Sequence, residues 1–337
     1  MALALAGLIG ASAPAAVAAP AAGSSKSANA PSQQKPAPKR KTSTKKKKKA
    51  ATAAAPAPMS FGQKLGLRKT PDALALGSSV ALVADQQTGD ILVSKNIDAV
   101  LPIASLTKLM TALVVIEAAQ PLDDVLTISQ ADVDTYKGTH SRLAVGGRLS
   151  RDDLLLLALM SSENRAAAAL GRNYPGGTPA FVVAMNHRAR TLGMTKTRFV
   201  DATGLSSGNT STARDLLKLT AAVYQEPLIR AYSTRESHHV RPARQPLNYV
   251  SSNRLVRGVN DWIIGLQKTG FTNEAGRCLV MQAMVQQRPL AMIFLDSTGT
   301  MTRYGDASRV RAWLQGDEAR AIKVDQRRQA GDTLSHS

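Results

Sequence analysis

Three short motifs lie far apart in this chain but in a fixed order, so a fold in which they act together must bring three distant segments into contact. They are S-x-x-K at Ser105–Lys108, S-x-N at Ser162–Asn164 and K-T-G at Lys268–Gly270. The first two patterns also occur elsewhere, for example at Ser43–Lys46, Ser207–Asn209 and Ser251–Asn253, whereas K-T-G occurs once. The context favours the ordered set, because Ser105 opens an apolar helical pattern, Ser162 follows another, and Lys268 starts a strand-like segment.

The spacing of Ser105 and Lys108 suits nucleophilic catalysis. A serine hydroxyl is a weak nucleophile until a base takes its proton, and a lysine three residues further along a helix lies on the same face. Positions 106, 109, 110 and 113 are apolar, so we expect desolvation to favour the neutral amine of Lys108. A second cation nearby, Lys268, would act in the same direction.

The other two motifs supply complementary groups. We expect Ser162 to pass a proton to the leaving nitrogen, and Asn164 to orient both the lysine and the substrate amide. Lys268 and Thr269 would then hold a substrate carboxylate.

The motifs and their surroundings resemble the D-alanyl-D-alanine endopeptidases among the low-molecular-mass penicillin-binding proteins. The resemblance covers roughly Gly77 to Leu314 and is carried by Pro102–Ser105, Leu154–Ala168, Tyr174–Gly177, Thr203–Leu205, Ser211–Leu216 and Lys268–Gly276. It implies that Ser105 is the acyl nucleophile, Lys108 its base, and Ser162 with Asn164 the second catalytic element. It also implies that Lys268, Thr269 and Gly270 form a substrate-facing strand, with the backbone N–H groups of Ser105 and Phe271 as the oxyanion hole.

The function that the resemblance implies is hydrolysis of D-alanyl cross-links in peptidoglycan through a Ser105 acyl-enzyme that β-lactams block covalently. A D,D-carboxypeptidase is the alternative, because a terminal D-Ala-D-Ala also carries a carboxylate beside the scissile amide. Residues 271–337 follow the K-T-G motif, and we expect those up to about 315 to complete the fold. The remainder is then too short for the C-terminal β-domain and anchor that many carboxypeptidases carry. A β-lactamase is less expected, since no E-x-x-L-N segment lies between Asn164 and Lys268.

Composition divides the chain into four parts. Residues 1–19 are a signal-like segment with Ala16–Ala18 as a candidate cleavage site, which predicts export to the periplasm. Residues 20–58 form an Ala/Pro/Lys-rich basic linker that we expect to be disordered, 59–315 the catalytic domain, and 316–337 a polar tail.

The linker carries much of the charge of the chain. Ten of its residues are Lys or Arg and none is acidic, so it supplies +10 of the net +19. Three interpretations follow: a solvated tether, an arm attracted to anionic envelope surfaces, or a phosphate-binding tail of a nucleic-acid-binding protein. The rest of the chain shows no RNA motif, zinc spacing or helix-turn-helix, so we expect no specific nucleic acid.

The coarse pattern of elements predicts an α+β fold of one catalytic domain. A hairpin is expected from Val80–Ala84 and Ile91–Lys95, two strands at Cys278–Val285 and Leu290–Leu295, and helices between and after them. The helices are expected at Leu106–Ala118, Ser150–Met160, Arg165–Gly171, Pro179–Leu192, Thr212–Tyr224, Pro227–Ser233 and Ala307–Leu314. This order implies one antiparallel sheet built from both ends of the chain with helices on both faces. The resemblance implies the same serine β-lactamase and D,D-peptidase fold.

The cysteine and the histidines of the chain do not indicate a bound metal or cofactor. Cys278 lies in an apolar strand-like run, so we expect a buried, inert thiol. The five histidines show no ligand spacing, His238–His239 suggests a surface loop, and no glycine-rich phosphate loop is present. We therefore expect neither a metal nor a cofactor.

Overall fold

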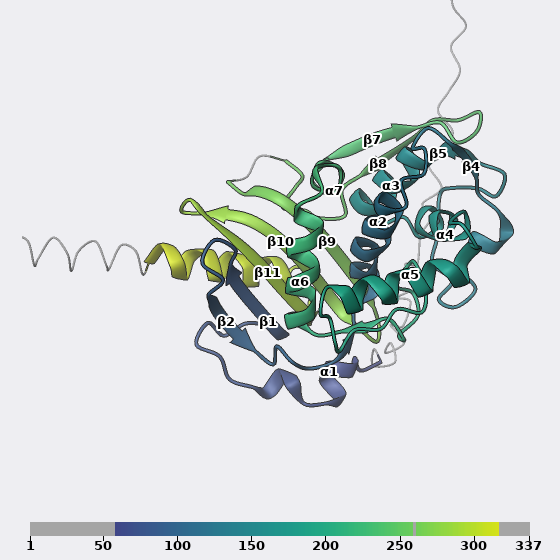
Figure 1. The fold of residues 1–337 in the computed structure, drawn as a ribbon. Coiled ribbons are helices and arrows are strands. Elements are labelled where there is room, and N and C mark those ends of the chain that lie inside the picture. The colour runs from purple at the N-terminus through teal and green to yellow at the C-terminus, as the bar shows by residue number, and fades with distance from the viewer. Residues whose placement is uncertain (1–57, 259–260, 317–337) are drawn as a thin grey trace, which may run out of the picture. The chain divides into compact units, whose positions relative to one another are not determined.

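The computed structural model describes residues 58–258 and 261–316. A five-stranded antiparallel sheet in the order β2-β1-β11-β10-β9 lies at its centre (Figure 1). The strands are β1 (Ser78–Asp85), β2 (Ile91–Lys95), β9 (Ile263–Thr272), β10 (Gly276–Val285) and β11 (Arg288–Ser297). β1 pairs with β11, with Leu82 opposite Ile293, so the sheet joins both ends of the described part of the chain. This confirms the predicted sheet and its α+β class.

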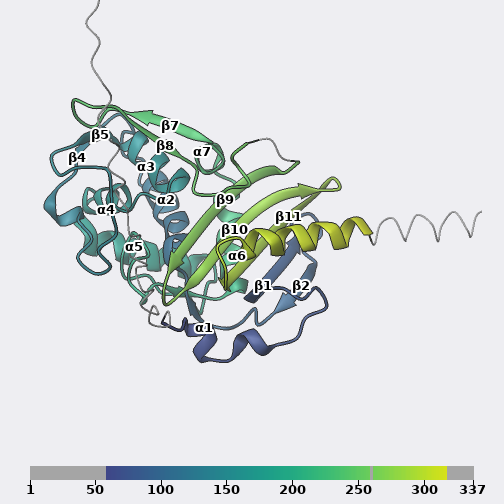
Figure 2. The same ribbon diagram turned by 180° about the vertical axis from the view of Figure 1, so that it is seen from behind.

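Helices cover both faces of this sheet because alternate strand residues point to opposite sides. Val80, Leu82 and Ile293 belong to the larger core, which includes residues of α2 to α7. Ala81, Val83 and Met292 belong to a second core, where the C-terminal helix at 302–316 packs (Figure 2). The larger layer consists of α2 (Thr107–Glu117), α3 (Arg151–Met160), α4 (Asn164–Arg172), α5 (Gly177–Thr191), α6 (Ala213–Tyr224) and α7 (Pro227–Ser233).

The predicted long elements are confirmed to within two or three residues, and α7 matches its predicted bounds, but the C-terminal helix begins at 302, five residues before its predicted start. The start of α3 is capped, since Ser150 Oγ accepts a hydrogen bond from the Asp153 N–H at 3.0 Å. The Asp153 carboxylate, however, contacts His238 Nε2 at 2.7 Å. The prediction of a loop at His238–His239 was wrong, because both residues lie in a strand.

Several short elements have no counterpart among the predictions. They are α1 (Phe61–Lys64), η1 (Leu67–Lys69), β3 (Leu101–Pro102), η2 (Ala104–Leu106), β4 (Val125–Thr127), η3 (Gln130–Asp132), β5 (Arg148–Ser150), β6 (Thr210–Ser211), β7 (Ser237–Val240) and β8 (Leu247–Val250). They form two-stranded ribbons β3-β6, β4-β5 and β7-β8 around the helical layer. The signal-like segment, all but the last residue of the basic linker, and all but the first residue of the polar tail lie outside the described residues.

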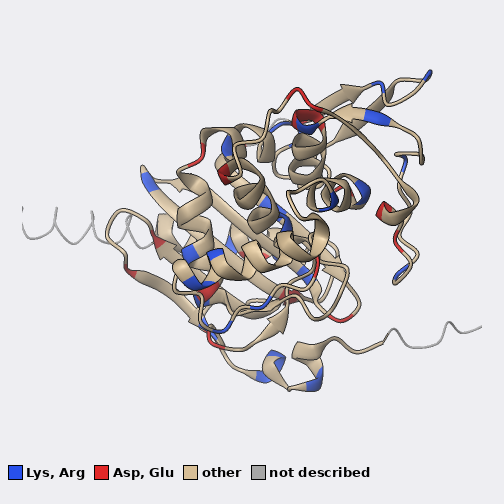
Figure 3. Ribbon diagram, turned by 45° about the vertical axis from the view of Figure 1, so that its right-hand side comes forward, with Lys and Arg blue, Asp and Glu red and all other residues tan. Residues whose placement is uncertain are grey.

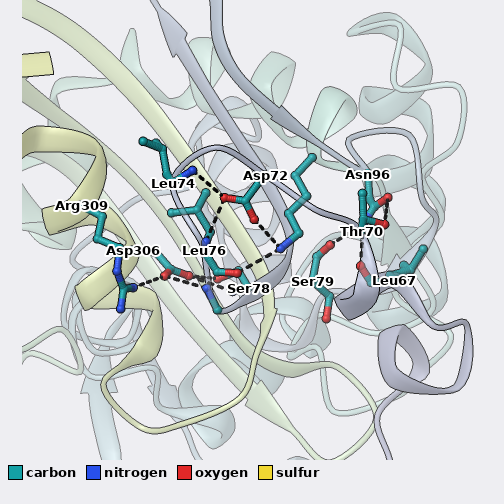
Figure 4. Close-up of polar contacts among 12 residues, drawn as sticks. Leu67, Thr70, Asp72, Leu74, Leu76, Ser78, Ser79, Asn96, Asp306 and Arg309 are labelled. Atoms are coloured by element: carbon teal, nitrogen blue, oxygen red, sulfur yellow. Dashed lines mark hydrogen bonds and ion pairs between the residues drawn. The ribbon is translucent and has the colours of Figure 1, made fainter. Parts of the chain in front are cut away.

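Buried polar groups fix the chain before β1 to the edge of the sheet (Figure 4). Lys95 Nζ, in β2, donates to Asp72 Oδ2 at 2.8 Å and to the Leu76 carbonyl at 3.0 Å. Asp306, in the C-terminal helix, accepts the N–H groups of Gly77 and Ser78 at 3.0 and 2.9 Å. The segment that leads into β1 is therefore held in place by β2 and by the C-terminal helix.

Cys278 lies in β10 with no exposed surface. Burial raises the pKa of its thiol to about 12, so the thiolate is not formed at neutral pH. This confirms the predicted buried thiol.

Candidate active site

The fold brings the three sequence motifs to one place. Ser105 lies in η2, one short turn before α2, and Lys108 lies in the first turn of α2. Ser162 lies in the turn between α3 and α4, and Asn164 is the first residue of α4. Lys268 to Phe271 lie in β9, an edge strand that packs against η2.

Lys108 is the centre of this constellation. Its Nζ lies 2.9 Å from Ser105 Oγ, 2.8 Å from Asn164 Oδ1 and 2.6 Å from the Thr203 carbonyl oxygen. A neutral amine has two N–H bonds and one lone pair, which fits two of these partners as acceptors and the Ser105 hydroxyl as donor. The geometry therefore suits removal of the Ser105 proton.

The environment of Lys108 favours that neutral form. The side chain is fully buried. Burial lowers the pKa of its amine to about 7, against the opposing effect of Asp201 and Glu163, whose charges raise it. Close to half of the molecules would thus hold a neutral Lys108 at neutral pH, compared with about one in 2,500 for a lysine with its ordinary pKa near 10.4. Burial is the leading cause of the lowered pKa, as we predicted from the apolar residues around Lys108 in the sequence.

The backbone before Ser105 has an uncommon conformation. Ala104 has a φ of +47° although it carries a side chain, and such strain is concentrated at functional sites. Thr107 Oγ1 donates to the Ala104 carbonyl at 2.8 Å and holds this turn. Two glycines make room for it. A Cβ on Gly204, where φ is +83°, would lie 1.9 Å from the Ala104 carbonyl oxygen, and a Cβ on Gly270 would lie 3.1 Å from the Ser105 nitrogen.

The loop that carries Gly204 is ordered by a single carboxylate. Asp201 accepts hydrogen bonds from the N–H groups of Thr203, Gly204 and Ser206 at 2.6, 2.7 and 3.0 Å. This places the Thr203 carbonyl on Lys108 Nζ. Asp201 thus affects Lys108 in two ways. It positions the carbonyl that the amine contacts, and its negative charge raises the pKa of the amine.

Asn164 of the S-x-N motif faces the same space, and Ser162 lies two residues before it. Ser162 has a φ of +64°, an αL conformation that non-glycine residues adopt with strain. Asn164 contacts Lys108 through its oxygen and donates from Nδ2 to Thr139 Oγ1 at 3.0 Å. Thr139 in turn donates to Asp134 Oδ2 at 2.7 Å, so the loop before α3 is fixed to the asparagine.

Lys268 and Thr269 lie on β9, the strand that packs against the turn carrying Ser105. Lys268 is fully buried, and Nζ donates to the Thr269 carbonyl at 2.8 Å. Burial first, and then the charges of Lys108 and Arg303, hold the pKa of Lys268 well below its usual range. Repulsion between the two lysines therefore disfavours a state in which both amines are charged. Thr269 Oγ1 donates to Ser252 Oγ at 2.7 Å.

Arg303, in the C-terminal helix, is a further candidate for the site, and its charge acts on Lys268. It is only 6% exposed, and among the described residues its Nε and Nη1 atoms have no hydrogen-bond partner. Its Nη2 donates to Tyr304 Oη at 3.1 Å, and Tyr304 Oη donates to the Ser252 carbonyl at 3.4 Å. Arg303 is thereby linked to Ser252, the residue that Thr269 contacts. Unpaired buried guanidinium N–H groups next to a buried lysine form a strong site for a carboxylate. A lone arginine in a helix gives no sequence signal of this kind.

A cavity of about 210 Å³ opens over Ser105. Its lining includes Asn164 and Thr139 on one side, Gly204 and Leu205 below, and Phe271 on the β9 side. Lys137, which also lines it, forms an ion pair with Glu274 in the β9–β10 turn at 2.5 Å. The ion pair joins the two walls at the mouth of the cavity.

Comparison with known proteins identifies the family of the chain. The family described as D-alanyl-D-alanine carboxypeptidase, peptidase S11, matches residues 67–299. The chain belongs to this family. It is 50% identical over 249 residues to a D-alanyl-D-alanine endopeptidase of Pseudomonas aeruginosa, covering 73% of this chain and 80% of the relative. It is 47% identical over 242 residues to the Escherichia coli protein of the same name, covering 71% and 78%.

Solved structures share the fold. Penicillin-binding protein D2 of Listeria monocytogenes, in its cefotaxime-bound form, has a TM-score of 0.60 at 30% identity, covering 71% of this chain and 97% of that one. The Streptomyces K15 DD-transpeptidase has a TM-score of 0.65 at 25% identity, covering 72% and 98%. This S11 chain thus has the serine D,D-peptidase fold that its motifs predicted.

Proposed function

We propose that this S11 peptidase hydrolyses D-alanyl peptide bonds of peptidoglycan through an acyl-enzyme on Ser105. The observation that carries the proposal is the position of a buried Lys108 amine within 2.9 Å of Ser105 Oγ and 2.8 Å of Asn164 Oδ1. A nucleophile and a base whose pKa is tuned near the working pH satisfy the two requirements of covalent acyl transfer.

The first half of the reaction makes the ester. Ser105 Oγ attacks the carbonyl carbon of D-alanine while its proton passes to Lys108 Nζ. The resulting oxyanion accepts hydrogen bonds from the N–H groups of Ser105 and Phe271, which lie on the two elements that Gly270 brings together. The C–N bond then breaks, and the leaving nitrogen receives a proton from the Lys108 ammonium, with Ser162 as the relay.

The second half reverses these roles. Water attacks the ester carbonyl and gives a proton to Lys108, the C–Oγ bond breaks, and Ser105 recovers its proton. A β-lactam enters the first half in the same way, but its leaving nitrogen stays tethered by the rest of the ring. The acyl-enzyme then persists, so β-lactams act as covalent inhibitors.

Arg303, Lys268 and Thr269 are proposed to bind the carboxylate beside the scissile amide. An anion there would raise the pKa of Lys268 again and restore its charge, because an opposite charge favours the ionised form. The same carboxylate is present in a cross-link and in a terminal D-Ala-D-Ala, so these three residues can bind either substrate.

The endopeptidase activity is favoured by the relatives. Those that are 50% and 47% identical are named endopeptidases, whereas the carboxypeptidases DacF of Bacillus subtilis and DacC of Escherichia coli are each 30% identical. Carboxypeptidase activity is the second candidate, because the family description names it.

Cross-linked and uncross-linked muropeptides, resolved by mass after incubation with the purified protein, separate these activities. Loss of dimers without free D-alanine supports the endopeptidase. Release of free D-alanine from monomers supports the carboxypeptidase, and unchanged muropeptides would contradict both.

The location that fits this substrate is the periplasm, reached through the signal-like segment at 1–19. None of the helices in residues 58–258 and 261–316 combines the length and hydropathy needed for a bilayer crossing. The basic linker is proposed to attract the enzyme to anionic envelope surfaces through its ten positive charges.

A further inference from the structure

The β7–β8 ribbon continues from the wall of the active site to the protein surface. Ser252, two residues after β8, accepts the hydrogen bond from Thr269 Oγ1, and its N–H donates to the Met160 carbonyl at 2.9 Å. His238 in β7 contacts Asp153 in α3. The ribbon is therefore fixed at its base to β9 and to α3.

Four arginines gather along this ribbon, and we call them the arginine cluster. Arg241 and Arg244 lie in the turn between β7 and β8, and the Arg148 N–H donates to the Pro242 carbonyl at 2.9 Å, which places β5 against that turn. The fourth, Arg142, lies with its guanidinium 4.0 Å from the centre of the Tyr249 ring in β8.

The four arginines of the cluster are exposed and without an ion-pair partner among the described residues. The stretches 141–150 and 240–250, which supply them, contain no Asp or Glu. In Figure 3 the ribbon at the upper right shows blue segments toward its tip. Such a one-sign surface attracts anionic polymers and loses attraction as salt is added.

The chemistry of arginine indicates which anionic polymer the cluster binds. Guanidinium groups bind carboxylates in a bidentate manner, and peptidoglycan stem peptides present free carboxylates at regular intervals along a polymer. Nucleic acid is less suited, because Tyr249, the aromatic residue of the cluster, is only 2% exposed and offers no face on which bases could stack.

We propose that the arginine cluster is a docking surface for the carboxylates of intact peptidoglycan, separate from the catalytic cavity. The proposal rests on the proposed function, since it assigns a surface to the same polymer. Stem peptides neighbouring the one in the cavity bind along the ribbon, and the local concentration of scissile bonds at Ser105 rises accordingly.

The test compares two triple variants of the full chain. R148Q/R241Q/R244Q removes three charges from the cluster and leaves Arg142 in place on Tyr249. R190Q/K196Q/R198Q removes three charges from exposed positions at the end of α5 and after it, on a different side of the helical layer in Figures 1 and 2. Binding to purified peptidoglycan sacculi is measured by sedimentation at low and high salt.

We expect the cluster variant to bind sacculi on the order of tenfold more weakly at low salt, with the difference shrinking at high salt, while the matched variant stays close to the unmodified chain. Labelling by a fluorescent penicillin and turnover of a small D-alanyl peptide should be unchanged in both variants. An equal loss in both variants, no loss in the cluster variant, or selective loss of binding to anionic vesicles or DNA instead of sacculi would overturn the proposal. Failure of the proposed function is distinguishable, because it would show as absent labelling and turnover in the unmodified chain.

Discussion

The pH dependence of acylation tests the role of Lys108 most quantitatively. Only the neutral amine can accept the Ser105 proton, so the rate should follow the fraction of neutral lysine. With a pKa of about 7, that fraction rises from about 9% at pH 6 to about 91% at pH 8. The second-order rate constant for acylation by a fluorescent penicillin should therefore rise about tenfold between these two pH values.

Glu163→Gln moves this profile in a known direction. The Glu163 carboxylate raises the pKa of Lys108, so its removal should lower the midpoint and increase the rate at pH 6 relative to that at pH 8. Lys108→Arg, a control that keeps the charge, should show no measurable acylation because arginine cannot release its proton at accessible pH. A rate that is flat from pH 6 to 8, or that rises only near pH 10, would refute the reasoning.

Three further outcomes are expected. Gly204→Ala should reduce acylation by at least about 100-fold, since its Cβ would lie 1.9 Å from the Ala104 carbonyl; near-normal labelling of the variant would show that the turn before Ser105 tolerates the shift. Arg303→Met should raise KM for D-alanyl peptides by on the order of tenfold or more with a smaller change in kcat, and it should have little effect on peptides with an amidated C-terminus. An equal effect on both peptides would exclude a carboxylate contact. Deletion of 20–57 should leave turnover of a small soluble D-alanyl peptide unchanged, and loss of that turnover would place the linker within the catalytic fold.

The sequence was most informative where long periodic patterns and chemistry coincided. The β1–β2 hairpin, α2, α3 and α7 could be predicted because each has an apolar pattern with a clear turn or cap. The motif residues Ser105, Lys108, Asn164 and Lys268 could be predicted because their types and order are specific.

The remaining features depend on tertiary contacts. β7 has the sequence Ser-His-His-Val, which lacks an apolar alternation, and it exists because β8 pairs with it. Arg303 becomes a site residue only because the C-terminal helix packs beside β9 and buries it. Asp201 precedes Thr203-Gly204-Leu205 by two residues, but its hydrogen bonds to that turn follow from the folded loop and not from any sequence pattern.

The central claim is that Ser105 forms the covalent acyl-enzyme, and mass spectrometry of the penicillin-treated protein tests it most directly. After proteolysis, we expect one peptide to carry the added mass of the β-lactam, with the modification on Ser105. Ser105→Ala, verified as folded by circular dichroism, should carry none. An adduct on another serine, or labelling that persists in the folded Ser105→Ala variant, would contradict the account.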